Sequence, residues 1–533
     1  MRILTVLLLL LYGFVSSAQN YVWAKGEGGI GNDAANGIAL DADGNTYITG
    51  NFAGSANFSG QSIQGGNLYD VFIAKYGPSG NLLWVKSNGG VNNEQGNAIR
   101  VKGGFIYICG FMEDSCYFGN QLFLTSGEAD VFTAKYDLDG NLIWVRKAGG
   151  TGFDYASSLD VDDQGHIYIA GTYENAITFD TAQLSTTNLF AESFYAKYDG
   201  NGQLLWAKST KGNSTNQLTG IAVAGDALYT TGFFGGNFKI GNTSLNSSTP
   251  SYDIVLARLD LNGNLQWMKK AGSTLEDAAN ALCIDQAGQA IIGGYFAGTA
   301  SFDNHTVTYY DYNDAFVAKY DSSGNNLWVR AGKGPELDAV FGITTDAENN
   351  IYATGLFEAS LDVEGTLLTG PDREVFIISY NPQGSLRWAT KGGGIQTECG
   401  LGIAIKDNSN VMACGYYLHT CSFGTISLDY ADANDLFLLE YDQPFVSGIE
   451  NNPTALRQKL YPTIIQNLDE LILPDWAQAN ATLQVFNGLG QLLYQTTLTS
   501  NRILSHPALP SGMYIIAIRN EANSINQKIF LRP

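Results

Sequence analysis

Two sets of mostly acidic residues recur along the chain at intervals of 60 to 62 residues, and they are the first candidates for chemistry. The first set is Asp33, Glu94, Asp154, Asn216, Asp277, Asp338 and Glu398. The second set is Asp70, Asp130, Glu192, Asp253, Asp314, Glu374 and Asp435. Carboxylates that converge on one axis could hold a hard cation such as Ca²⁺. Alternatively, these side chains are structural, because an acid at the start of a strand often accepts hydrogen bonds from nearby backbone N–H groups.

The remaining reactive residues form no recognisable catalytic or metal-binding set. The four histidines are His166, His305, His419 and His506, in unrelated positions. We find no nucleophile motif, no phosphate-binding loop and no histidine pair at helical spacing. Turns such as DADGN at 41–45 share Asp and Gly with calcium loops but lack the other ligands, and turn geometry accounts for them. We therefore predict no catalytic residue, no metal site in the turns and no cofactor, with Ca²⁺ on the axis as the open alternative.

Seven tryptophans mark the repeats that must position these residues. They are Trp23, Trp84, Trp144, Trp206, Trp267, Trp328 and Trp388, also 60 to 62 residues apart. Each repeat contains two β-hairpins, such as ANGIALDADGNTYITG (35–50) and DVFIAKYGPSGNLLW (70–84). Four strands in each of seven repeats predict an all-β fold, a seven-bladed β-propeller. We number the repeats 1 to 7 in chain order.

The two ends of this region predict how the ring closes. The last repeat stops at DLFLLEYD (435–442) without a tryptophan strand, whereas YVWAK (21–25) is a tryptophan strand without a repeat. We expect the N-terminal strand to complete the last blade, which would leave no exposed sheet edge.

The predicted topology also places the acids and the variable loops on one face. Strands one and three of each blade start at the same end of the ring, so the first acidic set would surround one mouth of the central channel. The connections between strands two and three open on that face, at about 51–69, 111–129, 172–191, 233–252, 295–313, 356–373 and 416–434. They carry Tyr309, Tyr310, Tyr312, Tyr416 and Tyr417. We interpret them as binding loops, with packing inside the loops as the alternative.

Three residue runs within 21–442 carry a resemblance to a known family. They are D-x-F-x-A-K-Y, G-N-L-x-W and G-N-x-Y-I-x-G. These repeats resemble the SBBP-type β-propeller repeats of bacterial surface proteins. The resemblance implies the propeller fold, and it implies no particular activity because that family has no single one.

The N-terminus is typical of a secretory signal peptide. Arg2 is followed by an apolar segment at 3–15 and by Ser16, Ser17 and Ala18, which predicts a signal peptide over 1–18 with cleavage after Ala18. No later apolar run is long enough to cross a bilayer. We therefore expect an exported protein without a transmembrane segment.

The repeat pattern ends at 442, and we expect a linker over 443–459 followed by a small β-sandwich domain over 460–533. Asn487–Gln491, Leu509–Tyr514 and the basic ending Lys528–Arg532 resemble the type A C-terminal sorting domain of the type IX secretion system of Bacteroidota. Tyr461-Pro462-Thr463 departs from the usual Y-P-N-P. The resemblance implies that residues 460–533 engage the type IX machinery, and that the protein is secreted or attached to the cell surface.

Four of the six cysteines form two equally spaced pairs. Cys109 and Cys116 are seven residues apart, as are Cys414 and Cys421, and both pairs occupy the same place in their repeats. In an exported protein this pattern predicts two disulfides. Cys283 and Cys399 are interpreted as buried thiols.

The net charge of the chain narrows the classes of partner that it could bind. The net charge of −22 disfavours nucleic acid and anionic lipid. We expect a binding scaffold for an extracellular glycan or protein, and not an enzyme. One alternative is an extracellular polysaccharide hydrolase or lyase with acids at the channel mouth. The other is a passive adhesion or surface-layer component.

Overall fold

The computed structural model describes residues 21–186, 189–248, 251–406, 410–429 and 433–443, and strands of a C-terminal unit between 464 and 531. The chain divides into two compact units, Met1–Pro444 and Phe445–Pro533. The predicted signal peptide with Ala18, and the linker beyond residue 443, lie outside the described residues. The described secondary structure is all β, and none of it is a helix that could cross a membrane.

In the larger unit, each repeat is a group of four antiparallel strands. The groups are β2 (Ala34–Leu40), β3 (Thr46–Phe58), β4 (Gln61–Tyr76) and β5 (Leu82–Gly90) in repeat 1; β6 (Glu94–Lys102), β7 (Phe105–Phe118), β8 (Gln121–Asp137) and β9 (Leu142–Gly149) in repeat 2; β10 (Tyr155–Val161), β11 (Ile167–Tyr173), β14 (Glu192–Tyr198) and β15 (Leu204–Ser209) in repeat 3; β17 (Asn216–Ala224), β18 (Ala227–Gly235), β21 (Tyr252–Asp260) and β22 (Leu265–Ala271) in repeat 4; β23 (Ala278–Ile284), β24 (Ala290–Phe296), β27 (Asp314–Tyr320) and β28 (Asn326–Lys333) in repeat 5; β29 (Ala339–Thr345), β30 (Ile351–Val363), β31 (Thr366–Tyr380) and β32 (Leu386–Gly394) in repeat 6; and β33 (Glu398–Lys406), β34 (Asn410–Tyr417) and β37 (Asp435–Asp442), joined by β1 (Tyr21–Gly29), in repeat 7.

Shorter strands belong to the connections between the main strands. They are β12 (Ala176–Phe179), β13 (Ala182–Ser185), β16 (Lys211–Gly212), β19 (Asn237–Ile240), β20 (Thr243–Asn246), β25 (Thr299–Phe302), β26 (His305–Thr308), β35 (Cys421–Phe423) and β36 (Ile426–Ser427). In repeats 1, 2 and 6 the second and third strands are long enough to form the same hairpin themselves.

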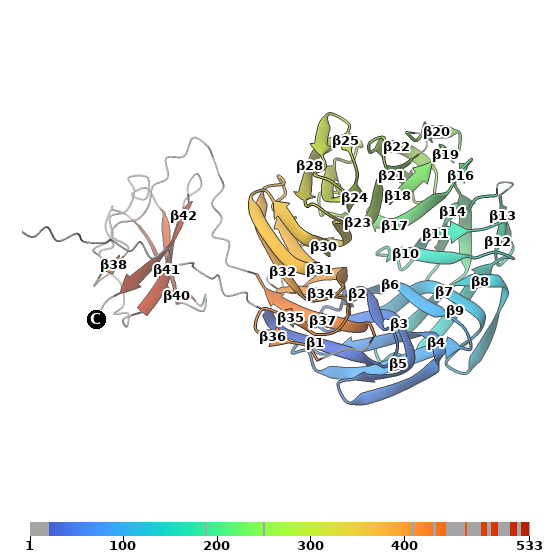
Figure 1. Cartoon of the computed structure of the whole chain (residues 1–533), viewed down its shortest axis with the longest axis horizontal. Coiled ribbons are helices and arrows are strands. Elements are labelled where there is room, and N and C mark those ends of the chain that lie inside the picture. The colour runs from blue at the N-terminus through green and yellow to red at the C-terminus, as the bar shows by residue number, and fades with distance from the viewer. Residues whose placement is uncertain are drawn as a thin grey trace, which may run out of the picture. The chain divides into compact units, whose positions relative to one another are not determined.

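The groups surround a central axis, with β2, β6, β10, β17 and β23 nearest to it (Figure 1). The first strands contact one another in circular order: β2, β6, β10, β17, β23, β29, β33 and again β2. The N-terminal strand pairs with the last repeat, as the sequence predicts, with Trp23 opposite Glu440 and Glu27 opposite Leu436. Apolar cores lie between neighbouring groups, and one of them joins Met412 and Leu438 of repeat 7 to Phe52 and Phe72 of repeat 1.

Two sequence features explain the local structure. The turns of the Asp-x-x-Gly-Asn type close on their own aspartate: Asp137 accepts hydrogen bonds from the N–H groups of Asp139 (3.0 Å) and Asn141 (2.8 Å), and Gly140 has a φ of 73°. The tryptophan side chains join neighbouring repeats. Five indole N–H groups each donate to a backbone carbonyl in the turn between strands three and four of the following repeat. The pairs are Trp84 with Leu138, Trp144 with Gly200, Trp206 with Leu261, Trp267 with Ser322 and Trp328 with Pro382.

The structure contradicts the predicted disulfides, since Cys109, Cys116, Cys414 and Cys421 are all free and buried. Cys109 and Cys116 lie on the same strand, β7, and belong to different core clusters. Seven extended residues span roughly 23 Å, whereas bridged cysteines need Cα atoms within about 7 Å. Cys414 and Cys421 also belong to different clusters.

These free thiols give a direct prediction. We expect iodoacetamide to add to all six cysteines when the protein is denatured without prior reduction, because none of them is oxidised. Intact mass spectrometry would measure the number of adducts. Addition to only two cysteines would restore the two disulfides and contradict the structure.

The described part of the C-terminal unit is one five-stranded sheet in the order β38 (Ile464–Ile465), β42 (Ser524–Leu531), β41 (Gly512–Arg519), β39 (Thr482–Asn487) and β40 (Leu492–Thr497). Leu483, Val485 and Ile516 are fully buried. The described strands form a single layer, so the predicted second layer of a β-sandwich stays a prediction.

Candidate functional site

The central channel is lined by residues that protrude from β-bulges in the first strands. Each first strand has one extra residue relative to its partner, at Asn36, Asn97, Ser157, Thr219, Asn280, Phe341 and Leu401, and all of them line the channel cavity. Such bulges redirect a side chain out of the regular alternation. The cavity measures about 130 Å³.

Four of the five polar side chains of this bulge ring donate hydrogen bonds within the protein, whereas the buried Ser157 hydroxyl has no partner among the described residues. Asn36 donates to the carbonyl of Gly96 (3.0 Å), and Asn97 donates to the carbonyl of Ala156 (2.8 Å). Thr219 and Asn280 make the equivalent bonds to the carbonyls of Ala279 and Val340. These bonds connect first strands that are neighbours around the axis, so these four side chains have a structural role.

The structure places the first acidic set away from the channel. None of Asp33, Glu94, Asp154, Asn216, Asp277, Asp338 and Glu398 lines the cavity, and all are buried between repeats. In five of the six acids the carboxyl group accepts a hydrogen bond from the backbone N–H group four residues earlier, as in Gly150 to Asp154 (2.7 Å) and Gly394 to Glu398 (3.0 Å). Asp338 instead accepts one from the N–H of Glu358 (3.3 Å). These contacts are the ones that the structural alternative predicts for the acids.

Residues of the second set hold the connections between strands two and three in place. Asp130 accepts a hydrogen bond from the N–H of Ser126 (2.9 Å), and Asp314 accepts one from the N–H of Tyr310 (2.8 Å). Acids of the two sets also meet in pairs at six of the seven junctions between repeats, the exception being Glu192, which faces Asn216. Burial and the neighbouring Asp314 carboxyl raise the pKa of Asp338 to about 9, and burial with Asp130 as a further cause raises the pKa of Asp154 to about 7.

The predicted loop tyrosines separate into two groups. Tyr309, Tyr310 and Tyr312 follow β26 and are exposed, with 70% of Tyr310 accessible. Tyr416 and Tyr417 instead continue strand β34, and Tyr417 is buried with its hydroxyl donating to the carbonyl of Asp429 (3.2 Å). Tyr417 is therefore not available to a ligand, whereas Tyr416 is partly exposed. Because both belong to a strand, their inclusion among loop residues is wrong.

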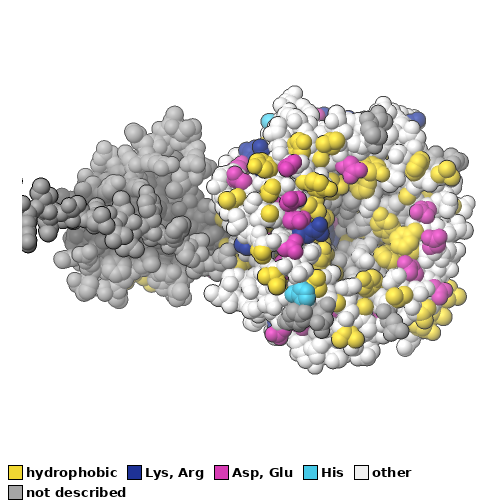
Figure 2. All heavy atoms as spheres, viewed as in Figure 1, with side chains coloured by type: hydrophobic (Ala, Val, Ile, Leu, Met, Phe, Trp, Pro, Cys, Tyr) yellow, Lys and Arg dark blue, Asp and Glu magenta, His cyan; other side chains and the backbone are white. Residues whose placement is uncertain are grey.

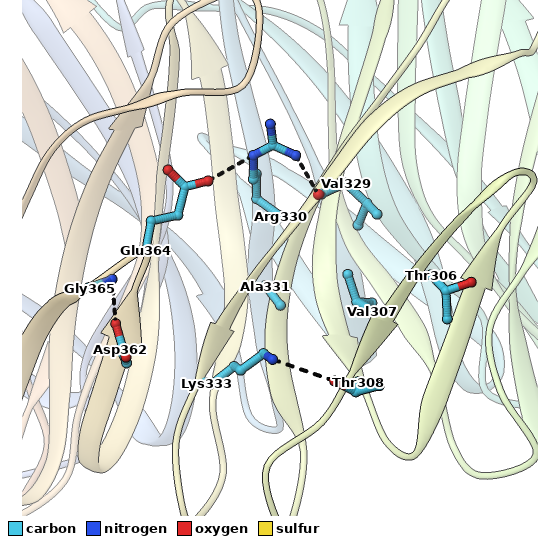
Figure 3. Close-up of a pocket in the computed structure, with 10 residues that line it drawn as sticks. All are labelled: Thr306, Val307, Thr308, Val329, Arg330, Ala331, Lys333, Asp362, Glu364 and Gly365. Atoms are coloured by element: carbon cyan, nitrogen blue, oxygen red, sulfur yellow. Dashed lines mark hydrogen bonds and ion pairs between the residues drawn. The ribbon is translucent and has the colours of Figure 1, made fainter.

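A groove lies beside the exposed tyrosine segment. It has a volume of about 370 Å³ and is bordered by the hairpin β25–β26, strand β28 and the tip of the hairpin β30–β31 (Figure 3). It therefore lies between the connections of repeats 5 and 6. Its lining residues are Thr306, Val307, Thr308, Val329, Arg330, Ala331, Lys333, Asp362, Glu364 and Gly365.

The charged groups of the groove are held by neighbours on opposite walls. Arg330 reaches Glu364 (2.8 Å) from β28 to the β30–β31 tip, and Lys333 reaches Thr308 (3.5 Å) on the hairpin side (Figure 3). Both walls thus present paired donors and acceptors around a floor of Val329 and Ala331. This combination suits a polar ligand with an apolar face.

Hydrophobic side chains are interspersed with acidic ones over the face of the larger unit seen in Figure 2. The loops that join strand four to the next strand one also expose apolar tips. These are Ile30, Val91, Leu275 and Ile395, with Ile30 85% accessible. Ile30, Val91 and Ile395 lie three residues before the first-set acid and Leu275 lies two before it, so apolar side chains are exposed in the same loop of four repeats.

Sequence reasoning missed the bulge ring and the groove. The bulge residues lie three positions after each residue of the first acidic set, so their spacing was visible in the sequence. The groove had no such signal, because it forms between connections of two repeats that differ in sequence.

Comparison with known proteins assigns a family to the C-terminal region of the chain. The family model for a secretion system C-terminal sorting domain matches residues 465–532. The chain carries a type IX sorting domain. This match confirms the assignment made from Leu509–Tyr514 and Lys528–Arg532, and it indicates export through that system.

The curated relatives are more distant. An uncharacterised WD repeat-containing protein, L264, of Acanthamoeba polyphaga mimivirus is 22% identical over 511 residues, covering 75% of this chain and 36% of the relative. The regulatory protein FlaEY of Caulobacter vibrioides is 23% identical over 441 residues, covering 74% and 44%. The chain thus spans less than half the length of these relatives.

Solved structures with some similarity include Sqt1 from Chaetomium thermophilum, with 9% identity, a TM-score of 0.40 and coverage of 80% of this chain and 99% of that chain. PorZ, a surface component of the type IX secretion system of Porphyromonas gingivalis, has 11% identity, a TM-score of 0.16 and coverage of 94% and 81%. The specific SBBP repeat family is not among these findings.

Proposed function

We propose that this protein is a secreted or surface-displayed seven-bladed β-propeller over residues 21–442 that binds an extracellular glycan or protein. In this proposal, the signal peptide and residues 460–533 serve export through the type IX machinery. The observation that carries the binding role is the exposed Tyr309–Tyr312 segment beside the groove of repeats 5 and 6. Exposed aromatics on an anchored loop favour stacking on sugar rings or contacts with a protein.

The anchoring of the loop supports this site. The N–H of Tyr309 donates to the carbonyl of Gly298 (3.0 Å), and the N–H of Tyr310 donates to the buried Asp314. The loop backbone is therefore fixed while the tyrosine rings remain accessible. A pre-organised aromatic surface loses less conformational entropy on binding than a free one.

The geometry gives less support to the alternative of a polysaccharide hydrolase or lyase. The acids proposed for that chemistry, such as Asp154 and Asp277, are fully buried and accept backbone hydrogen bonds. A general acid or base must reach the substrate within hydrogen-bond distance, directly or through one water molecule.

The first experiment is a binding screen of the exported propeller on arrays of polysaccharides and of extracellular proteins. We expect a ligand whose affinity falls at least tenfold in a variant with Tyr310→Ala and Tyr312→Ala. Truncation of an aromatic hot spot costs about 2 kcal/mol or more, which exceeds tenfold in affinity. Isothermal titration calorimetry with the captured ligand would measure the loss.

Tyr117→Ala is the matched control, because Tyr117 is 51% accessible on the corresponding connection of repeat 2. It should leave the affinity unchanged. Equal losses in both variants would disprove this site, and silence on both arrays would contradict the binding proposal.

A further inference from the structure

Two junctions between repeats bring two carboxyl groups together without a lysine beside them. They are Asp70–Glu94, between repeats 1 and 2, and Asp33–Asp435, between repeats 1 and 7. All four residues are buried except Asp435, which is partly buried. At three other junctions a fourth-strand lysine pairs with the second-set acid, namely Lys147 with Asp130, Lys270 with Asp253 and Lys391 with Glu374. Ser87 and Gly26 stand at the corresponding positions of the two junctions without lysine.

The two carboxyl groups of the Asp70–Glu94 pair share the N–H of Gly90 as a donor, and Asp70 also accepts a hydrogen bond from the N–H of Gly66. The N–H of Gly90 lies 3.1 Å from Asp70 Oδ1 and 2.9 Å from Glu94 Oε2. Both residues are buried, and Glu94 Oε1 has no hydrogen-bond donor within the described part of the chain. The other titratable groups that act on this pair are Glu113 and Cys116, neither of which is positively charged.

The Asp33–Asp435 pair, at the junction between repeats 7 and 1, also brings two carboxyl groups together without a positive charge. Asp33 accepts hydrogen bonds from the N–H groups of Gly29 (2.7 Å) and Ala53 (2.9 Å). Asp435 Oδ1 is buried without a donor in the described residues, and a Cβ on Gly28 would overlap both carboxyl groups. The further titratable groups around the pair are Glu27 and Tyr417.

Two ionised carboxylates in contact away from solvent repel each other strongly, so a positive charge must accompany them. A calcium ion would need six to eight oxygen ligands. The neighbours here are N–H donors, which repel a cation, and the described residues include no cluster of three acids or other ligands that could hold a metal. A proton needs only the two carboxyl oxygens.

We propose that the Asp70–Glu94 and Asp33–Asp435 pairs each share one proton near neutral pH, and that losing this proton loosens the junctions between repeats 1, 2 and 7. The proton leaves to solvent as the pH rises, and two adjoining carboxylates remain. The repeats then separate most readily at the two junctions that involve repeat 1, including the one closed by β1.

The shifts in pKa agree with this assignment. Burial, with Asp70 as the next cause, raises the pKa of Glu94 to about 9, and burial raises the pKa of Asp33 and of Asp435 to about 7. Because the unfolded chain releases these protons near pH 4, the folded state holds more protons between about pH 4 and the folded values. Stability from the pairs is therefore full below about pH 4 and falls as the pH rises to 7–9.

The test is the pH dependence of thermal unfolding of the full chain between pH 5 and 9.5, comparing the wild type with Glu94→Gln. Glutamine is uncharged and can donate to Asp70, as a protonated glutamic acid does. We expect the wild-type midpoint to fall as the pH rises, and the fall to be several degrees smaller in the variant. Parallel curves for the two proteins would overturn the proposal.

Repeat 4 offers the opposite substitution, because Asn216 stands where the other repeats have the first-set acid opposite Glu192. Lys211 already pairs with Glu192 at this junction (3.1 Å), so Asn216→Asp should leave the slope nearly unchanged, and a fall that steepens there would count against a special role for the pairs without lysine. If Glu94→Gln does not fold, Asp435→Asn tests the other pair by the same measurement. The third measurement adds calcium chloride to both proteins. If calcium raises the unfolding midpoint of the wild type but not of Glu94→Gln, the pair binds a cation, and the proposal of a shared proton is overturned.

Discussion

Gly232→Ala is expected to destabilise the larger unit by about 3 kcal/mol, near the upper limit for overpacking a core. Gly232 lies on β18 opposite Leu218, next to the bulge of β17, and a Cβ there would overlap the backbone carbonyl oxygen of Gln217. Backbone atoms of two hydrogen-bonded strands cannot move apart without loss of the pairing. Denaturant unfolding followed by circular dichroism would measure the change.

Glycines at the same position in the other repeats make the same close approach. They are Gly50, Gly110, Gly171, Gly294, Gly355 and Gly415, each against a first-strand carbonyl. The Y-I-x-G run therefore ends in glycine because the bulge of the first strand brings a backbone carbonyl too close for a Cβ atom. We expect alanine at any of these positions to be costly for the same reason.

Gly200→Ala is the matched control for Gly232→Ala. A Cβ on Gly200 would meet only the carbonyl oxygen of Gly165, at 3.5 Å, which is an ordinary contact. Other repeats carry Leu138, Leu261 and Ser322 at the corresponding turn position. The free energy of unfolding should change by less than about 0.5 kcal/mol. Similar losses in both variants would show that the close approach is not the cause.

Much of the fold could be predicted because each repeat presents the same information again. The tryptophan spacing, the hairpin turns and the unmatched strand at 21–25 all depend on neighbours within a few residues or on simple counting. The sorting domain was identifiable from short motifs such as Leu509–Tyr514. These features do not require knowledge of how neighbouring repeats pack.

The site depended on packing that the sequence pattern does not contain. Asp154 and Asp277 directly precede strand one, but their side chains are held by N–H groups of two loops, the loop that enters the repeat and the connection between its strands two and three. The cysteine spacing suggested proximity, yet Cys109 and Cys116 lie along one continuous strand. Tyr417 was read as a loop residue because β34 extends beyond the expected end of the hairpin.

Ring closure depends on one buried acid, Glu440 on β37. Its carboxylate accepts hydrogen bonds from the indole of Trp23 on β1 (2.8 Å) and from Lys406 on β33 (2.9 Å), and Asn410 donates to its other oxygen. Lys406 also donates to the carbonyl of Pro78 in repeat 1 (2.6 Å). The group therefore connects the N-terminal strand, the last repeat and the first repeat.

We expect Glu440→Ala to cost about 3–5 kcal/mol, because it leaves the Lys406 ammonium buried without its counter-charge. Hydrogen exchange should accelerate in Tyr21–Gly29 more than in β17, far from the junction, which separates loosened closure from general destabilisation. Glu440→Gln keeps an oxygen for Trp23 and should lose less, while Asp442→Ala, at an exposed position of the same strand, should be nearly neutral. Uniform acceleration over the whole ring would mean that closure by β1 does not depend on this group.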